Sequence, residues 1–184
     1  AFNFYYGENL KLLENTCHVE YFSPIEDEKL PECDLVFIGG GYPELYKEEL
    51  SSNKSMINSI REKADKGTFI IGEAAGFMYL SSMIEGIPMC GIFKGESSMT
   101  DRLQRFGYVN MELNQDTIMG EKGTLLKGNE FHYSTMEIDG EPLFNISKPK
   151  GNRKWQCGYS YKNVLGYYQH INFLGNIYSF KYLL

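Results

Sequence analysis

Apolar runs and amphipathic segments alternate along the first half of the chain. Two continuous apolar runs, at residues 34–38 and 68–71, predict strands that are buried on both faces. Between them, residues 54–66 are amphipathic, and they are followed by Gly67, a residue type that commonly ends a helix. Strand, helix, strand, turn and helix in this order are typical of a parallel sheet with helices on both faces. The second helix is expected to run through Phe77, Met78, Leu80 and Met83.

Shorter patterns occupy the N-terminal segment and the second half. Residues 1–6 and 19–22 predict strands, and residues 8–15 predict a helix with leucines on one face. The second half alternates apolar and polar residues and is rich in aromatic residues and glycine, which predicts antiparallel strands before a closing helix. The strands are expected at residues 108–113, 123–134, 136–138 and 158–169, and the helix at 175–184. Because no repeat or linker interrupts the pattern, we expect residues 1–184 to form a single α/β domain.

The net charge of the chain argues against two classes of binding partner. Eighteen Lys and Arg residues against 24 Asp and Glu give a formal charge of −6, which argues against binding to nucleic acid or to an anionic membrane. No apolar run reaches the ~18 residues of a membrane span, and the N-terminus lacks the basic region of a signal peptide. We therefore expect a cytoplasmic protein. The chain begins without methionine, on an apolar and aromatic run, so we expect it to be a piece of a longer protein.

The cysteines give no sign of a metal site or a disulfide framework. They are widely scattered, without a Cys-x-x-Cys pair or a histidine at zinc-finger spacing. We expect reduced, mostly buried thiols and no metal or cofactor in this domain. The four residues are Cys17, Cys33, Cys90 and Cys157.

A glycine-rich turn follows the first buried strand. Residues 39–44 read Gly-Gly-Gly-Tyr-Pro-Glu, and three successive glycines let backbone N–H groups approach a ligand, as an oxyanion or carboxylate pocket requires. A tight connection without a ligand fits the same residues about equally well. A Gly-x-x-x-x-Gly-Lys-Ser/Thr sequence is absent from the chain, so the sequence does not support ATP binding by this piece.

The second buried strand leads into a sharp turn and a helix at residues 70–77. This pattern is typical of a nucleophile elbow, where the residue at the tip stands above the sheet and the next N–H faces the bound carbonyl oxygen. The tip is Ala74, which has no nucleophilic atom, and the residues alone favour a structural turn. Of the three histidines, His170 ends a predicted strand, His132 lies within one, and the isolated His18 is expected to be structural.

Taken together, these segments resemble a known family over nearly the whole chain. The sequence is similar to the C-terminal glutamine amidotransferase domain of cobyrinic acid a,c-diamide synthases, in the CobB/CobQ-type group. The similar motifs stand in the order of that family: residues 1–6, 8–10, 22–24, 39–45, 99–100, 103–109, 130–134, 158–159, 163–164 and 170.

The resemblance implies a fold and a set of site residues. It implies a flavodoxin-like, class I amidotransferase fold in which an elbow cysteine attacks the side-chain amide of glutamine. Residues 73–80 read Glu-Ala-Ala-Gly-Phe-Met-Tyr-Leu where the family has Glu-Cys-Gly-Gly, so Ala74 stands at the nucleophile's position. His170 matches the histidine that keeps the cysteine as thiolate, and Asn172 stands where other class I enzymes have a glutamate. The resemblance assigns oxyanion or substrate contacts to Gly40, Gly41, Tyr42, Ala75, Glu130 and His132.

The resemblance also implies partners. The chain would supply ammonia from glutamine to an N-terminal synthetase domain of the same enzyme, which uses ATP and magnesium to amidate corrin carboxylates in cobalamin biosynthesis. That domain is absent from this chain, and the missing phosphate-binding loop agrees with its absence. Nucleic acid and membrane are not expected as partners.

The alanine at position 74 leaves two explanations and several functions open. Ala74 could be an engineered inactivation, or the chain could be a natural homologue that has lost activity; Ala75 for Gly and Asn129 for the family's common His favour natural drift. Without a thiol we expect glutamine hydrolysis to fall to background. The alternatives are a non-catalytic glutamine-binding or docking module of the same fold, and an amidotransferase for another tetrapyrrole.

Overall fold

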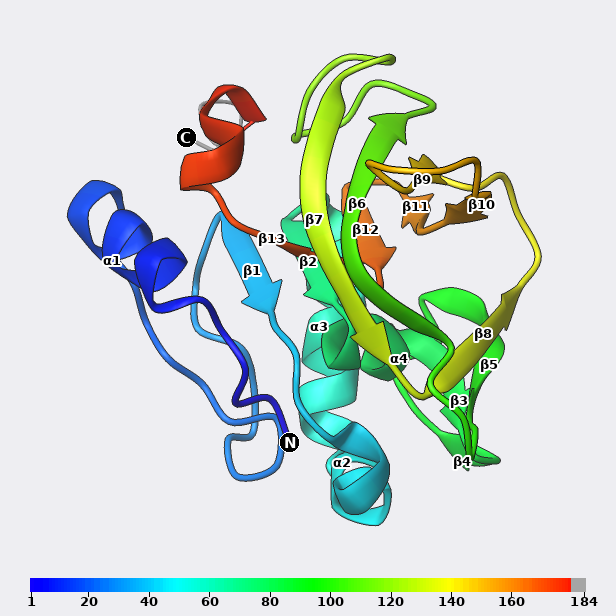
Figure 1. The fold of residues 1–184 in the computed structure, drawn as a ribbon. Coiled ribbons are helices and arrows are strands. Elements are labelled where there is room, and N and C mark those ends of the chain that lie inside the picture. The colour runs from blue at the N-terminus through cyan, green and yellow to red at the C-terminus, as the bar shows by residue number, and fades with distance from the viewer. Residues whose placement is uncertain (180–184) are drawn as a thin grey trace.

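Three β-sheets and short helices make up the part of the chain that the computed structural model describes, residues 1–179 (Figure 1). The elements follow in this order: α1 (Gly7–Thr16), β1 (Leu35–Ile38), η1 (Pro43–Tyr46), α2 (Lys47–Ser52), α3 (Lys54–Lys66), β2 (Phe69–Glu73), α4 (Ala75–Leu80), β3 (Ser81–Ile84), β4 (Ile87–Pro88), β5 (Phe93–Met99), β6 (Arg105–Leu113), β7 (Leu125–His132), β8 (Ser134–Ile138), β9 (Phe144–Ser147), β10 (Lys154–Cys157), β11 (Tyr159–Tyr161), β12 (Val164–Tyr167), β13 (His170–Ile171) and η2 (Leu174–Asn176).

The central sheet has the order β1-β2-β12-β11. The two apolar runs of the first half form β1 and β2, as predicted, and these strands pair in parallel. The single antiparallel strand predicted at residues 158–169 is wrong in two respects. The segment turns back at Lys162, whose φ is 50°, to give β11 and β12, and β12 runs parallel to β2. The three parallel strands therefore end together, at Ile38, Glu73 and Tyr167.

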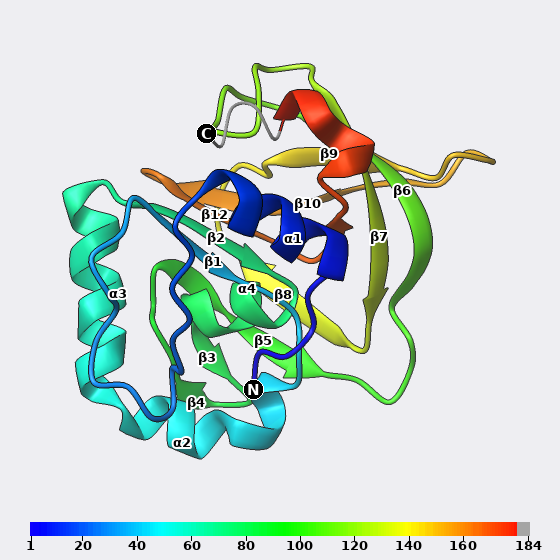
Figure 2. The ribbon, with the colours of Figure 1, turned by 90° about the vertical axis from the view of Figure 1, so that its left-hand side faces the viewer.

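Both faces of the central sheet are buried because its strand residues alternate between two apolar clusters. Figure 2 shows α3 on one side of β1 and β2 and the long strands β6 and β7 on the other. The predicted parallel sheet with helices on both faces and antiparallel additions is confirmed: α3 and α4 cover one face, and α1 joins the antiparallel sheet β10-β9-β6-β7-β13 on the other. The side chains on the first face are Val36, Ile38, Ile70 and Val164; those on the second are Leu35, Phe37, Ile71 and Leu165.

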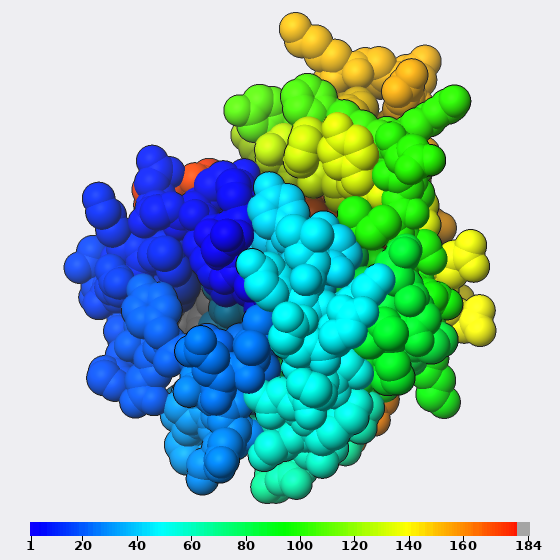
Figure 3. Space-filling view, turned by 90° about the horizontal axis from the view of Figure 1, so that it is seen from below, coloured from blue at the N-terminus to red at the C-terminus, as the bar shows by residue number. Residues whose placement is uncertain are grey.

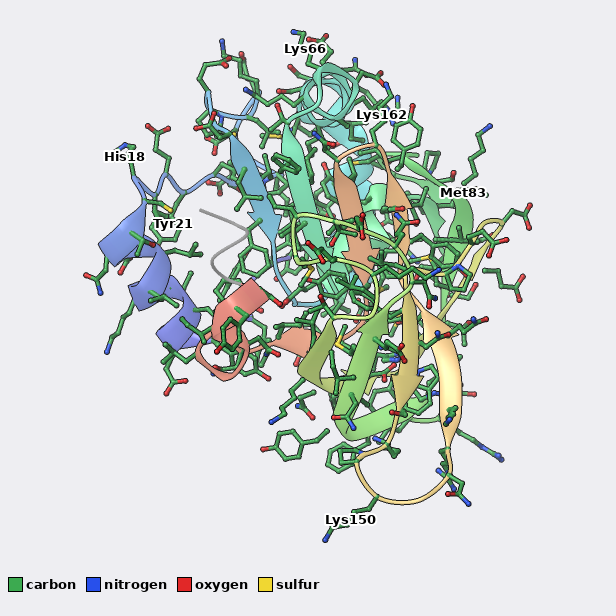
Figure 4. All side chains as sticks on the ribbon, turned by 90° about the horizontal axis from the view of Figure 1, so that it is seen from above. His18, Tyr21, Lys66, Met83, Lys150 and Lys162 are labelled. Carbon is green, nitrogen blue, oxygen red and sulfur yellow. The ribbon has the colours of Figure 1, made fainter. Side chains whose placement is uncertain are left out.

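Local signals explain why the amphipathic helix α3 begins and ends where it was predicted. The Asn53 side chain accepts a hydrogen bond from the Met56 N–H at the N-terminus. At the other end Gly67 has φ = 91°, the left-handed conformation that glycine adopts without strain. The turn between β11 and β12 lies beside this helix, where Lys162 pairs with Asp65 at 2.7 Å (Figure 4). The buried side chains of α3 are Met56, Ile57, Ile60 and Ala64.

The helix predicted after β2 is shorter than its apolar spacing suggests. It ends at Leu80, because the Ser81 hydroxyl donates to the Met78 carbonyl at 2.7 Å and the chain then enters β3. The prediction that Met83 continues the helix is wrong: Met83 lies on β3, in the small sheet β4-β3-β5-β8 (Figure 4).

The N-terminal residues form an extended segment instead of the predicted strand. An isolated bridge joins Phe4 of this segment to Gly40, and the Tyr42 N–H donates to the Ala1 carbonyl at 2.9 Å. Gly41 permits this approach, since a Cβ there would collide with the Ala1 carbonyl. Figure 3 shows the dark blue N-terminal segment against the cyan residues of η1 and α2. Residues 8–15 lie within helix α1, as predicted, whereas residues 19–22 form no strand.

The antiparallel strands of the second half agree in part with the prediction. Residues 108–113 lie within β6, but the strand predicted at 123–134 ends at His132, and β8 begins at Ser134. The β9–β10 hairpin was not predicted; Figure 4 shows Lys150 at its tip. The closing helix begins as η2 and continues through residues 177–179, and residues 180–184 lie outside the described part. Within residues 1–179, none of the helices has the length and apolarity needed to cross a membrane.

Candidate active site

The turn from β2 to α4 has the backbone geometry of a nucleophile elbow. Ala74 lies at its tip with φ = 47° and ψ = −101°, a conformation that costs an L-residue about 1–3 kcal/mol. Its N–H donates to the Tyr167 carbonyl at 2.8 Å, and the residue is 9% exposed. The strained conformation is therefore kept although the side chain is a methyl group.

Glycines allow this turn to pack against the ends of the neighbouring strands. The Gly76 N–H donates to the Gly39 carbonyl at 3.0 Å, and a Cβ on Gly76 would collide with the Ile38 carbonyl. A Cβ on Gly72 would lie 2.7 Å from the Leu80 Cδ1. The glycine-rich turn after β1 and the elbow after β2 are thus held side by side, as expected at the carboxyl ends of parallel strands.

The backbone N–H groups of these two turns differ in their partners. The Gly40 N–H donates to the Phe4 carbonyl at 3.1 Å, so it is not free. Among the described residues, no backbone acceptor takes the N–H of Gly41 or of Ala75. Tyr42 has a mostly exposed side chain. The glycine-rich turn and the elbow therefore each leave one amide donor without a backbone acceptor among the described residues.

His170 lies directly beside these turns. It is 8% exposed on β13, where it pairs with Asn129 of β7. The Phe4 ring packs edge-on against the imidazole at a centroid distance of 4.7 Å. A Cβ on Gly40 would lie 2.6 Å from the His170 Cε1, so only glycine leaves room for the imidazole.

A buried carboxylate that was not predicted as a site residue faces this histidine. Glu73, 3% exposed, places Oε2 3.4 Å from the His170 Nδ1. Its Oε1 accepts the Ile171 N–H at 3.2 Å and lies 3.5 Å from the Tyr167 hydroxyl. Burial raises the pKa of Glu73, while the contacts with His170, Ile171 and Tyr167 oppose that rise. The signal was available in the sequence, because Glu73 is the one charged residue in an otherwise apolar strand.

Asn172, two residues after His170, is directed elsewhere. Its amide donates to Glu8 Oε2 at 2.8 Å, and its Oδ1 accepts the Gly175 N–H at 2.9 Å. The side chain therefore connects α1 to the C-terminal turn. Glu73 is the carboxylate that contacts the imidazole.

Glu130 and His132, which the resemblance also assigned to the site, lie on the other face of β7. Asn129 pairs with His170, and successive strand residues point to opposite faces, so Glu130 and His132 point away from the elbow. They line a separate cavity with Phe77 and Tyr168. The structure thus brings together Ala74, Ala75, Gly40, Gly41 and His170, while Glu130 and His132 form a second group. His18 is exposed and contacts Glu20 at 3.4 Å.

The cysteines do not supply the missing thiol. All four are free, and Cys90 is buried, Cys33 and Cys157 are partly buried and Cys17 is exposed, so the prediction of mostly buried thiols is only partly right. Burial raises the pKa of Cys90 to about 12 and that of Cys157 to about 11. Within residues 1–179 there is no group of three His, Cys, Asp or Glu side chains that could hold a metal ion.

Thiol labelling of the folded chain checks these surroundings. At pH 8 a thiol with a pKa near 11 is ionised in roughly one molecule in a thousand, so Cys157 should react with a disulfide reagent at least about a hundredfold more slowly than Cys17. Cys90 should react no faster than Cys157. Peptide mass spectrometry after timed labelling measures both rates, with the urea-unfolded chain as the control. Equal labelling rates for Cys17 and Cys157 in the folded chain would contradict the burial of the Cys157 thiol.

Comparison with known proteins adds a family to this geometry. The CobB/CobQ-like glutamine amidotransferase domain family matches residues 1–177. The chain is similar to the cobyrinate a,c-diamide synthases of Clostridium tetani (45% identity over 192 aligned residues) and Clostridium acetobutylicum (44% over 188). All of the chain is covered, but only 44% and 43% of those relatives, so the chain spans less than half of their length.

Solved structures share the fold at much lower sequence identity. The PurLQS structure from Thermotoga maritima aligns with a TM-score of 0.69 at 18% identity, covering 96% of this chain and 90% of that one. A glutamine amidotransferase from Thermotoga maritima aligns with a TM-score of 0.60 at 17% identity, covering 89% of this chain and 69% of that one.

Proposed function

Because the chain belongs to the CobB/CobQ-like glutamine amidotransferase domain family, we propose that it is the glutamine-handling module of a cobyrinate a,c-diamide synthase. Its role would be to bind glutamine and, with a cysteine at position 74, to release ammonia for the amidation of corrin carboxylates. The observation that carries the proposal is the strained backbone of Ala74 beside the buried pair of Glu73 and His170. Strain of this kind is retained where a site requires it.

Each group of the elbow has a part in such a reaction. A thiolate at position 74 would attack the glutamine amide carbon, and the oxyanion would form beside the N–H groups of Gly41 and Ala75. His170 would hold the thiolate and then give its proton to the leaving ammonia. Water would release glutamate from the thioester. Alanine at position 74 removes the first step, so the chain as written is proposed to be inactive in hydrolysis.

The exposed face around His170 supports a role beside a second domain. Phe106, Tyr108 and Phe131 are exposed on the face of β6 and β7 that also carries Asn129, the partner of His170 in the sheet. Exposed apolar patches of this kind mark protein interfaces. The proposed occupant of this face is the remaining part of the synthase. In the relatives that part makes up more than half of the length, and this chain does not span it. ATP and magnesium are assigned to that part.

Ala74 favours a second candidate function. A module that binds glutamine or docks the synthetase part without hydrolysis would keep the fold and the elbow while dispensing with the thiol. An amidotransferase for another tetrapyrrole would use the same residues, because the synthetase part selects the acceptor. A glutamine-binding module and an amidotransferase for another tetrapyrrole would both bind glutamine at the elbow. Only the binding module excludes glutamine hydrolysis in a cysteine variant.

Glutamine binding by the unmodified chain tests the shared premise. Isothermal titration should detect L-glutamine binding without release of glutamate, whereas D-glutamine should not bind. Gly40→Ala should weaken binding about tenfold or more, because its Cβ would displace His170. Gly7→Ala is the matched control, since a Cβ at Gly7 meets nothing within 4 Å. A folded chain that does not bind glutamine would contradict the proposal.

A further inference from the structure

A cavity of about 170 Å³ lies between the ends of β6 and β7 and the edge of the central sheet. Its volume exceeds what one water molecule needs. Exposed Arg105 and Gln156 are among the residues around it, whereas Glu130 is 1% exposed. The cavity is therefore a pocket with a polar, accessible rim and a buried carboxylate.

One oxygen of the Glu130 carboxylate has no hydrogen-bond partner in the described part of the chain. Glu130 Oε1 lies 2.9 Å from the His132 Nε2, but among the described residues nothing forms a hydrogen bond with Oε2. The other imidazole nitrogen, Nδ1, lies 2.7 Å from the Ser134 carbonyl, so it must carry a proton and donate. The ring also stacks on Tyr168 at a centroid distance of 3.9 Å with an angle of 4°. His132 is thus held on three sides and cannot turn to satisfy Oε2.

A hydrogen-bond donor without a partner lines the same cavity. The indole Nε1 of Trp155 is buried and donates to no described group. Arg105 lies over the indole ring at 5.0 Å, and its Nη1 donates to the Gln104 carbonyl at 2.9 Å. The guanidinium therefore has contacts of its own beside the pocket. An unpaired buried donor or acceptor costs about 1–3 kcal/mol. Among the described residues around this cavity, Glu130 Oε2 and the Trp155 N–H are such groups, and the buried Tyr168 hydroxyl, which can donate or accept, is a third.

The buried groups without a hydrogen-bond partner limit the chemistry of a ligand. Glu130 Oε2 requires an N–H or O–H donor, and the Trp155 N–H requires an acceptor such as a carbonyl oxygen. An ammonium ion would satisfy only the first group, and a carboxylate would satisfy only the second while being repelled by Glu130. A primary carboxamide carries both an N–H donor and a carbonyl acceptor.

We propose that this cavity binds a primary carboxamide group, with its N–H on Glu130 Oε2 and its carbonyl on the Trp155 N–H. The site is separate from the elbow, because Glu130 points to the face of β7 opposite the one that carries Asn129, the residue that pairs with His170 of β13. It goes beyond the proposed function, since it requires neither a thiol at position 74 nor glutamine hydrolysis. A carboxamide side chain of a larger molecule could enter past Arg105 and Gln156.

The single tryptophan of the chain provides the test. In a ¹⁵N-labelled full chain the Trp155 indole N–H gives one resonance, and titration with acetamide should shift it saturably as the N–H gains an acceptor. Acetate and methylammonium, which offer only one half of the pairing, should bind at least tenfold more weakly. Because this ligand series uses the unmodified chain, it does not depend on whether any variant folds.

A matched pair of variants locates the site. Glu130→Gln should weaken acetamide binding at least tenfold, and Glu112→Gln, at an exposed position on β6, should leave it unchanged. No saturable shift with acetamide would mean that the cavity holds only water and would overturn the proposal. Equal affinity for methylammonium or acetate, or unchanged binding in a folded Glu130→Gln chain, would overturn it as well. A failure here would leave glutamine binding at the elbow unaffected.

Discussion

Replacing Ala74 with cysteine is expected to give the chain glutamine hydrolysis at least about 10⁴-fold above that of the unmodified chain. The backbone at position 74 already has the elbow conformation, with φ = 47° and ψ = −101°, so the new Sγ would project from a position that needs no refolding. His170 lies beside the same turns, and among the described residues the Gly41 and Ala75 N–H groups have no backbone partners to give up. Coupled measurement of glutamate and ammonia from L-glutamine gives the rate.

Three further variants separate restored chemistry from other causes. Ala74→Ser should remain near background, because a serine hydroxyl beside the same histidine is a far weaker nucleophile than a thiolate. Ala74→Cys combined with His170→Ala should lose most of the gained activity, whereas Ala74→Cys combined with Gly7→Ala should keep it. A folded Ala74→Cys chain that binds glutamine but releases no glutamate would contradict the hydrolytic function and favour the binding module.

Local sequence signals were sufficient for the elements that build one side of the sheet. The buried runs of β1 and β2, and the Asn53 and Gly67 ends of α3, are set by residues within a few positions of each element. The pairing of β12 with β2 is different, since it joins residues more than 90 positions apart. It also needs Gly166, where a Cβ would collide with the Phe77 ring, a requirement that hydrophobic periodicity does not reveal.

The candidate site likewise contains residues that the sequence reveals and residues that only the three-dimensional contacts reveal. The family motifs led to Ala74 and His170, and the geometry adds Glu73, whose role depends on a contact between residues 97 positions apart. The motif around Glu130 suggested that its residues join the same site. Strand alternation places Glu130 on the other face of β7. The face on which a side chain lies depends on the pairing register of the strand, and a shift of one residue would move every side chain to the opposite face.

Glu73 is expected to position His170 in the Ala74→Cys chain. Replacing it with glutamine keeps the size of the side chain and an oxygen for the Ile171 N–H, but it removes the charge that faces the imidazole Nδ1 at 3.4 Å. Glutaminase activity should then fall about a hundredfold, mainly in kcat, because the imidazole loses the partner that fixes its orientation. Asn172→Ala is the matched control and should have little effect, since Asn172 contacts Glu8 instead.

The tautomer of His170 is a readout that a merely structural role of Glu73 would not change. Without the carboxylate, the proportion of the Nδ1–H tautomer of His170, measured by NMR, should differ between Glu73→Gln and the parent chain. Since burial raises the pKa of Glu73, the folded state binds its proton more tightly than the unfolded state does. Glu73 therefore favours folding most below its unfolded pKa of about 4.3, and that contribution is lost as the pH rises through the folded pKa. Glu73→Gln should remove the contribution of Glu73 to the pH dependence of stability. The difference in unfolding free energy between the Glu73→Gln chain and the parent chain should therefore change with pH between the unfolded and the folded pKa of Glu73. An unchanged proportion of the His170 tautomers would mean that Glu73 supports the fold alone.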